Sequence, residues 1–110
     1  MTKGDEEGAP ADLNEAVKLN ATGATVYFNR AFVLREKGDL IQALTDYDQT
    51  IALGPLFADA WAMRGLLKLR LHREADAQED FDQCLRLNPA LRASLDTLVQ
   101  TERLQLASKP

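Results

Sequence analysis

Two stretches of this 110-residue sequence decide its fold. The first is Ala24–Pro55, ATVYFNRAFVLREKGDLIQALTDYDQTIALGP, and the second is Ala58–Pro89, ADAWAMRGLLKLRLHREADAQEDFDQCLRLNP. A shift of 34 residues places eight identical residues opposite one another, where average composition would give roughly two. The identities are Ala24/Ala58, Arg30/Arg64, Ala43/Ala77, Asp46/Asp80, Asp48/Asp82, Gln49/Gln83, Leu53/Leu87 and Pro55/Pro89. The chain therefore contains an internal repeat, and a period in this range is typical of stacked helical units.

Each period is expected to form two helices joined by a tight turn. Apolar residues recur at helical spacing in both halves of each period. Gly38 suits the left-handed conformation that ends a helix, and Asp39 is a good N-cap for the next one. Pro55 and Pro89 close the two periods, because the residue before a proline avoids helix. The pattern predicts helices over Ala24–Glu36, Leu40–Leu53, Ala58–Leu71 and Glu74–Leu87.

This pattern resembles the tetratricopeptide repeat (TPR) family. In that family, a large aromatic and a small residue in the first helix are followed by an alanine, an aromatic and a small residue in the second, and a proline closes the repeat. The matching residues are Tyr27, Ala31, Ala43, Tyr47, Thr50 and Pro55, then Trp61, Gly65, Ala77, Phe81, Cys84 and Pro89. The resemblance implies an all-α fold, in which antiparallel helix pairs stack into a right-handed superhelix. Small residues would let the paired helices approach closely, and the aromatic residues would fill the space between neighbouring pairs.

The sequence after Pro89 predicts one more helix, from Ala90 to about Leu106. Leu95 takes the aromatic slot of the repeat in this helix and Val99 takes the small slot. We expect it to cap the array, because the open end of a stacked repeat needs a polar outer face. The residues assigned to that outer face are Gln100, Glu102, Arg103 and Gln105.

The sequence before Ala24 carries the pattern of a second helix without a first. Ala9, Asp12 and Leu19 precede their equivalents in the first period by 34 residues, and Pro10 suits the first turn of a helix. The expected parts are a flexible acidic segment (1–9), a half-repeat (10–23), two repeats (24–57 and 58–91), a capping helix (92–106) and a tail (107–110). A start within a repeat also fits a fragment of a longer array.

Composition excludes several classes of function. Apolar residues make up 45% and charged residues 27% of the chain, as in an ordinary globular domain. The net charge of −4 and the absence of a basic stripe argue against nucleic acid and against anionic membranes as partners. No apolar run resembles a leader or a spanning helix. The single cysteine excludes an internal disulfide and favours a reducing, cytoplasmic location.

The sequence offers few groups for catalysis, so we expect no enzyme activity, no cofactor and no metal site. His72, the only histidine, occupies the turn position that Gly38 holds in the first period and is predicted to be a surface turn residue. Cys84 is expected to pack as a small buried residue. The aspartates of the two Asp-aromatic-Asp sequences point roughly 200° apart on a helix, which does not form a chelating pair. We expect those aspartates, Asp46, Asp48, Asp80 and Asp82, to lie on solvated faces.

The resemblance implies that the first helix of each repeat lines a concave groove. We predict that the groove is largely apolar and binds a peptide or a helix of another protein. The residues predicted to form it are Phe28, Asn29, Phe32, Arg35, Met63, Leu66, Leu69 and Arg70. In the alternative, the C-terminal helix or a second copy of the chain covers this strip, and the chain serves self-association, for example as a homodimer through its N-terminal half-repeat.

One subclass of the family binds the C-terminal carboxylate of heat-shock chaperones through lysine, asparagine and arginine side chains. Asn29 resembles the asparagine of that clamp. In the next repeat, however, Asp59 and Met63 stand where the clamp needs a lysine and an arginine. We therefore predict that this chain is not a carboxylate-clamp binder and that its partner is anchored by apolar side chains.

Overall fold

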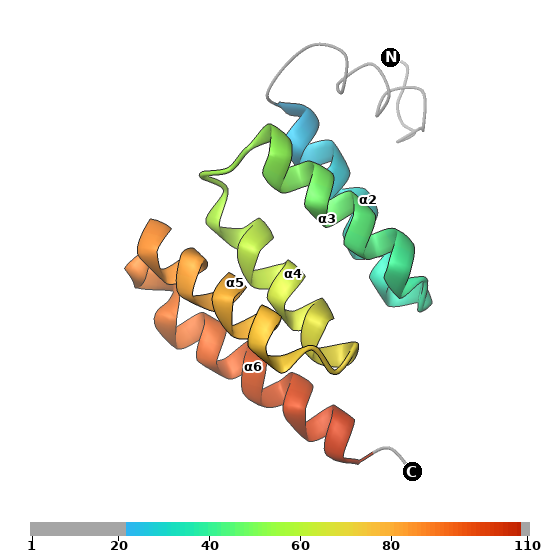
Figure 1. Cartoon of the computed structure of the whole chain (residues 1–110), viewed down its shortest axis with the longest axis vertical. Coiled ribbons are helices and arrows are strands. Elements are labelled where there is room, and N and C mark those ends of the chain that lie inside the picture. The colour runs from blue at the N-terminus through green and yellow to red at the C-terminus, as the bar shows by residue number, and fades with distance from the viewer. Residues whose placement is uncertain (1–21, 109–110) are drawn as a thin grey trace. The chain divides into compact units, whose positions relative to one another are not determined.

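A computed structural model describes residues 22–108, and all the regular structure in that range is helical (Figure 1). The α-helices are α2 (Thr22–Lys37), α3 (Leu40–Leu53), α4 (Ala58–Arg70), α5 (Glu74–Leu87) and α6 (Arg92–Ala107), and a 3-10 turn at Pro89–Leu91 precedes α6. Each helix predicted within this range is confirmed, with bounds that agree to within two residues. The predicted acidic segment and residues 10–21 of the half-repeat lie outside the described residues.

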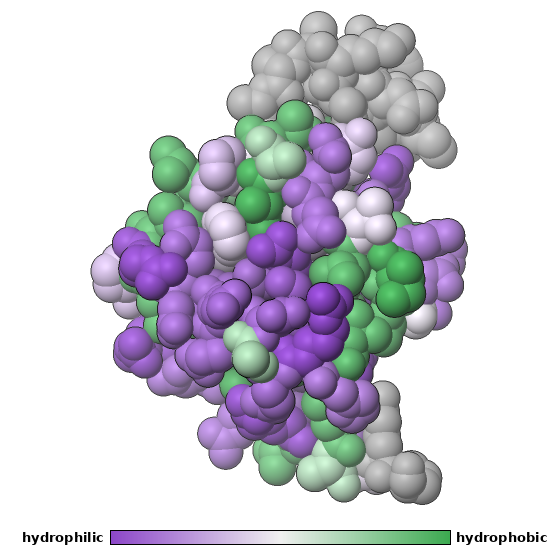
Figure 2. Space-filling model, in the orientation of Figure 1, coloured by the Kyte–Doolittle hydropathy of each residue, from purple (hydrophilic) through white to green (hydrophobic). Residues whose placement is uncertain are grey.

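The chain divides into two compact units after Pro55. The described part of the first unit is the antiparallel hairpin of α2 and α3, and the second unit consists of α4, α5 and α6 (Figure 1). The surface in Figure 2 is mostly hydrophilic, with separate hydrophobic patches. None of the helices in the described range is both long enough and apolar enough to span a membrane.

Both hairpins turn in the same way, because each first helix ends in a Schellman motif. In the first turn, Gly38 has φ +91°, and the N–H of Asp39 donates to the carbonyl of Leu34 at 2.9 Å. In the second, His72 has φ +64°, and the N–H of Arg73 donates to the carbonyl of Lys68 at 2.8 Å. His72 is exposed, so the prediction of a surface turn residue is confirmed. Asp39 stands at the predicted N-cap, but its side chain makes no capping hydrogen bond.

The buried side of the first hairpin is centred on Tyr47, which α3 presents. The ring of Phe28 from α2 packs edge-on against it, with centroids 5.9 Å apart and planes inclined by 61°. Ala31, Ala43 and Thr50 have no exposed surface, so the small residues of the repeat are buried as expected. Burial of this apolar surface stabilises a hairpin whose helices would be marginal alone.

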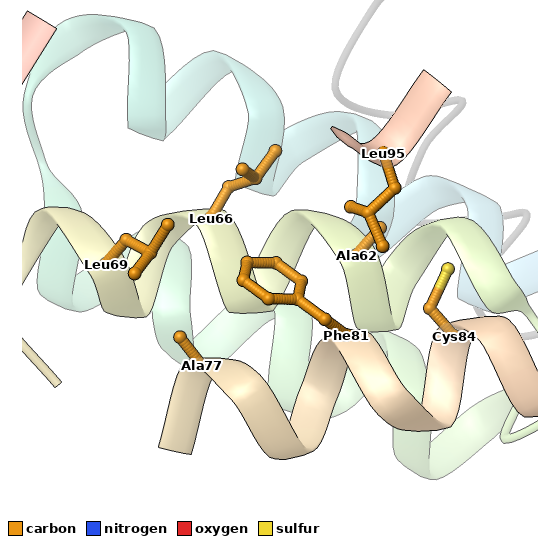
Figure 3. Close-up of a cluster of buried hydrophobic side chains, with 7 residues drawn as sticks. All are labelled: Ala62, Leu66, Leu69, Ala77, Phe81, Cys84 and Leu95. Atoms are coloured by element: carbon orange, nitrogen blue, oxygen red, sulfur yellow. The ribbon is translucent and has the colours of Figure 1, made fainter. Parts of the chain in front are cut away.

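The second unit has one hydrophobic core, to which all three of its helices contribute (Figure 3). Its members are Ala62, Leu66 and Leu69 of α4, Ala77, Phe81 and Cys84 of α5, and Leu95 of α6. Gly65 makes room for the ring of Phe81, because a Cβ at this position would lie 2.5 Å from its Cε1 atom. Trp61 packs against the margin of the same core. The aromatic and small slots of the repeat are therefore the positions that join α4 to α5.

Candidate functional site

An arginine of the first helix binds an aspartate of the second helix in both repeats. Arg30 donates two hydrogen bonds to Asp46, at 2.8 and 3.1 Å, and Arg64 donates two to Asp80, both at 2.9 Å. Each guanidinium also lies over the aromatic residue three positions earlier, Tyr27 or Trp61, about 5 Å from the ring centroid. Hydrogen bonding to Asp46 raises the pKa of Arg30. These bidentate pairs fasten the two helices of each hairpin to one another.

The prediction that all four aspartates are solvated is wrong for two of them. Asp46 and Asp80 are buried, whereas Asp48 and Asp82 are exposed. The spacing of residues along one helix predicts which side of that helix is polar. It does not show that an arginine of the neighbouring helix binds, and thereby buries, one aspartate of each pair. The sequence does contain a signal for this pair, because an arginine and an aspartate 16 residues apart recur in both repeats.

Chemistry at the remaining candidate residues is restricted by burial. Cys84 has no exposed surface, and its predicted packing role is confirmed. Burial and the nearby charge of Asp59 both raise the pKa of its thiol, which keeps it in the unreactive protonated form. In the part of the chain that the structure describes, no three histidine, cysteine, aspartate or glutamate side chains gather as potential metal ligands.

Cys84 should therefore resist alkylation until the second unit unfolds. We expect iodoacetamide to label the native chain at least roughly 100-fold more slowly than the urea-unfolded chain, since reaction requires an opening of the core. Mass spectrometry measures this directly, because the chain has a single cysteine. Similar labelling rates in the native and unfolded states would contradict the buried position of the thiol.

The four predicted groove residues of α2 lie on one side of the helix, where Phe32 follows Phe28 by four residues and Asn29 by three, and Arg35 follows Phe32 by three. Phe28 is half-buried against Tyr47. Asn29 is exposed, and Phe32 retains 45% of its surface. The side chain of Arg35 is only 12% exposed and forms an ion pair with Glu36 at 2.9 Å. The accessible part of this side is thus an aromatic ring, Phe32, next to a polar amide.

The four predicted groove residues of α4 are used largely within the second unit. Leu66 and Leu69 are each 2% exposed and belong to its core, and Met63 packs at the margin of that core. Arg70 donates two hydrogen bonds to Glu102 of α6, at 2.8 and 3.0 Å. Helix α6 thus engages the end of α4, in line with the alternative in which the C-terminal helix covers the strip.

Glu102 corrects a second expectation from the sequence. It was assigned to the polar outer face of the capping helix, but it is 3% exposed and bound to Arg70. The other three members of that set, Gln100, Arg103 and Gln105, are exposed. The repeat does not present this pair twice, because the positions 34 residues earlier hold Glu36 and Lys68, with the charges in the opposite order.

A second groove lies between α5 and α6, within the second unit. Its volume is about 660 Å³. Its apolar lining is formed by Phe81 and Leu85 of α5 and by Leu95, Val99 and Leu104 of α6. Charged and amide side chains line it as well, namely Gln78, Asp82, Arg92, Asp96, Gln100 and Arg103. An apolar floor between polar margins is the form of site that accepts an amphipathic helix.

Comparison with known proteins identifies the repeat. A family model described as a tetratricopeptide repeat matches residues 58–91. Tetratricopeptide repeat protein 36 of Bos taurus is 33% identical over 97 residues, which cover 84% of this chain and 52% of that protein. The Hsp70-Hsp90 organizing protein of Triticum aestivum is 29% identical over 83 residues, or 76% of this chain and 14% of that protein.

A similar match is found in an enzyme. The UDP-N-acetylglucosamine–peptide N-acetylglucosaminyltransferase of Giardia intestinalis is 30% identical over 78 residues, which cover 71% of this chain but 5% of the transferase. The chain therefore spans about half the length of one of these relatives and a small part of the other two. Repeats of this kind are generally non-catalytic and serve protein–protein interaction.

Proposed function

We propose that this chain, which belongs to the tetratricopeptide-repeat family, binds a peptide or a helix of another protein through the exposed side of α2. The observation that carries the proposal is the 45% exposure of Phe32 next to the exposed amide of Asn29. An accessible aromatic ring on a rigid helix is a typical anchor for a partner side chain, because its burial removes a large apolar area from water and costs little side-chain entropy. Asn29 would add a hydrogen bond that fixes the orientation of the partner.

The packing of the predicted groove narrows the partner's chemistry. Leu66, Leu69 and Arg70 are already engaged inside the second unit, so they have little surface left to offer a ligand. Phe32 and Asn29 of α2 have the most accessible surface among the eight predicted groove residues. This favours a partner with one apolar anchor side chain and a backbone or side-chain group that pairs with an amide.

A carboxylate clamp for heat-shock chaperones is not part of this proposal, despite the similarity to the Hsp70-Hsp90 organizing protein. Asp59 is exposed on α4 at one position where a clamp needs a cation, and Met63 stands at the other. A carboxylate close to Asp59 would be repelled. We also propose that the chain acts in the cytoplasm without catalysing a reaction.

The test begins with peptides selected from a displayed random library against the immobilised 110-residue chain. We expect Phe32→Asp to weaken the binding of the selected peptides by roughly 10- to 100-fold, because it replaces the apolar anchor with a charge. Fluorescence titration with labelled peptide measures the change. Leu66 is unsuitable for such a substitution, since a charge at a side chain 2% exposed would unfold the unit.

Ile41→Asp is the matched control for this experiment. Ile41 is 67% exposed in the first turn of α3, where the structure tolerates the same change from an apolar to a charged side chain. Its effect on binding should stay below about twofold. Equal binding by the wild type and the Phe32→Asp variant, with helicity unchanged in both, would remove α2 as the binding surface.

A further inference from the structure

We propose that the groove between α5 and α6 binds residues 10–20 of a second copy of this chain, so that copies associate head to tail. This surface shares no residue with the α2 surface proposed to bind peptides. The argument starts from the 34-residue register, which assigns to every position of α6 an equivalent in α4. Val99 is the equivalent of Gly65, and it lines the groove.

The contact made by Gly65 shows what belongs opposite Val99. In the second unit, the aromatic residue of the second helix, Phe81, occupies the space beside Gly65. By the same register, a second helix that pairs with α6 would place its own aromatic-slot residue beside Val99. The groove is therefore the position at which the repeat puts a second helix after α6.

The sequence supplies a segment with the pattern of such a helix at residues 10–20, PADLNEAVKLN. Leu13 stands in its aromatic slot, Ala16 in its small slot, and Val17 in the slot of Ile51 and Leu85. These spacings place all three side chains on one side of a helix. A helix with this apolar side and a charged opposite side matches a groove that has an apolar floor and polar margins.

The sizes of the contacting residues also correspond. Gly65 faces the large ring of Phe81, whereas Val99, with its bulkier side chain, would face the smaller Leu13. Close packing requires that the volumes on the two sides of an interface compensate in this way. The small slot of α6 thus holds a larger residue than in the second repeat, and the aromatic slot of the segment holds a smaller one, so the two changes compensate.

One position of this register is mismatched and gives a sharp test. Arg30 and Arg64 each bind the aspartate of their own second helix, but their equivalent in α6 is Leu98, which is 45% exposed. Asp12, the equivalent of Asp46 and Asp80, would therefore lack an arginine across this interface. The change Leu98→Arg supplies the arginine and should tighten the association roughly fivefold, as expected for an ion pair at an exposed position. Asp12→Asn should abolish that gain.

Analytical ultracentrifugation of the full chain over a concentration series measures the association. Each copy carries one groove and one segment, so the average mass should rise above that of the monomer as concentration increases, whether the copies close into a ring, as in a reciprocal dimer, or form an open chain. Val99→Lys prevents the groove from binding a segment, and Leu13→Asp prevents the segment from binding a groove, so each variant alone should be monomeric. Their equimolar mixture should form a dimer and nothing larger, because only one intact groove and one intact segment remain compatible.

Circular dichroism and Trp61 fluorescence check that both variants are folded. If Val99→Lys unfolds the second unit, Leu104→Lys is the replacement, because Leu104 also lines the groove and is 63% exposed. A wild-type chain that stays monomeric at about 1 mM would overturn the proposal, whether the groove is empty or holds the segment of its own chain. So would association that both blocking variants retain, or a gain from Leu98→Arg that Asp12→Asn leaves intact. Peptide binding by α2 is measured independently, so either proposal can fail alone.

Discussion

Replacing Asp80 with asparagine should lower the free energy of unfolding of the second unit by about 3 kcal/mol. The carboxylate of Asp80 is 4% exposed and binds two cations, Arg64 at 2.9 Å and Lys68 at 3.1 Å. Their side chains are 17% and 13% exposed, so solvent would compensate poorly for the lost negative charge. An amide of the same shape keeps the packing, but it removes the charge and turns one of the two acceptor oxygens into a donor that faces a cation. Urea unfolding followed by the fluorescence of Trp61, the sole tryptophan and a residue of this unit, measures the loss.

The first repeat provides the matched control, because it contains the same pair in a more exposed setting. The side chain of Arg30 is 48% exposed, and Leu34 stands where the second repeat has Lys68. Asp46→Asn should therefore cost about 1 kcal/mol or less, measured by circular dichroism. Lys68→Met should also be mild, since Asp80 keeps one counterion. An Asp80→Asn variant no less stable than Asp46→Asn would show that burial does not set the strength of this interaction.

The helices and turns of this fold could be predicted because they depend on local spacing. The period of 34 residues, the closing prolines and Gly38 define every helix in the described range to within two residues. The equivalence of His72 with Gly38 even predicts a left-handed turn at a non-glycine residue, and both positions have positive φ. Short-range preferences and tertiary packing agree at these positions, which is the condition under which sequence patterns predict structure well.

The exposure of the predicted groove residues could not be derived from the sequence, because exposure depends on which elements meet in three dimensions. The sequence places Phe32 and Leu66 on equivalent sides of their helices. The structure leaves Phe32 45% exposed and buries Leu66 in a core to which α6 contributes Leu95. The pairing of Arg70 with Glu102 joins residues 32 positions apart, and no local rule anticipates it. Arg30 and Asp46 were within reach of sequence reasoning, since the repeat presents the same pair twice.

The size of the residue at position 65 should be limited by the ring that faces it. A methyl group added to Gly65 would lie 2.5 Å from Cε1 and 2.8 Å from Cδ1 of Phe81, well inside van der Waals contact. That ring is 3% exposed and enclosed by the core, so it has little room to move. In an exposed helix, Gly→Ala gains about 1 kcal/mol. Here we expect Gly65→Ala to cost about 2 kcal/mol, because overpacking outweighs helix propensity.

A double-mutant cycle with Phe81→Leu separates overpacking from other effects of the alanine. Phe81→Leu alone should cost about 1 to 1.5 kcal/mol for lost contacts. In its presence Gly65→Ala should become neutral or stabilising, so the two changes together should cost less than their sum by about 2 kcal/mol. Urea unfolding monitored by Trp61 fluorescence gives all three values. Additive effects would mean that the ring of Phe81 does not limit position 65.

The equivalent position of the first repeat should respond to the opposite change. Ala31 has no exposed surface and shares its hairpin with Tyr47, which is also fully buried. Ala31→Gly should therefore cost about 1 to 2 kcal/mol, from lost helix propensity and a small cavity, measured by circular dichroism. A methyl group would thus be required in one repeat and excluded from the next. If glycine were preferred at both positions, the small slot would only reflect the close approach of the two helices. The size of the facing residue would then not determine the residue in this slot, and the size argument for pairing Val99 with Leu13 would fail.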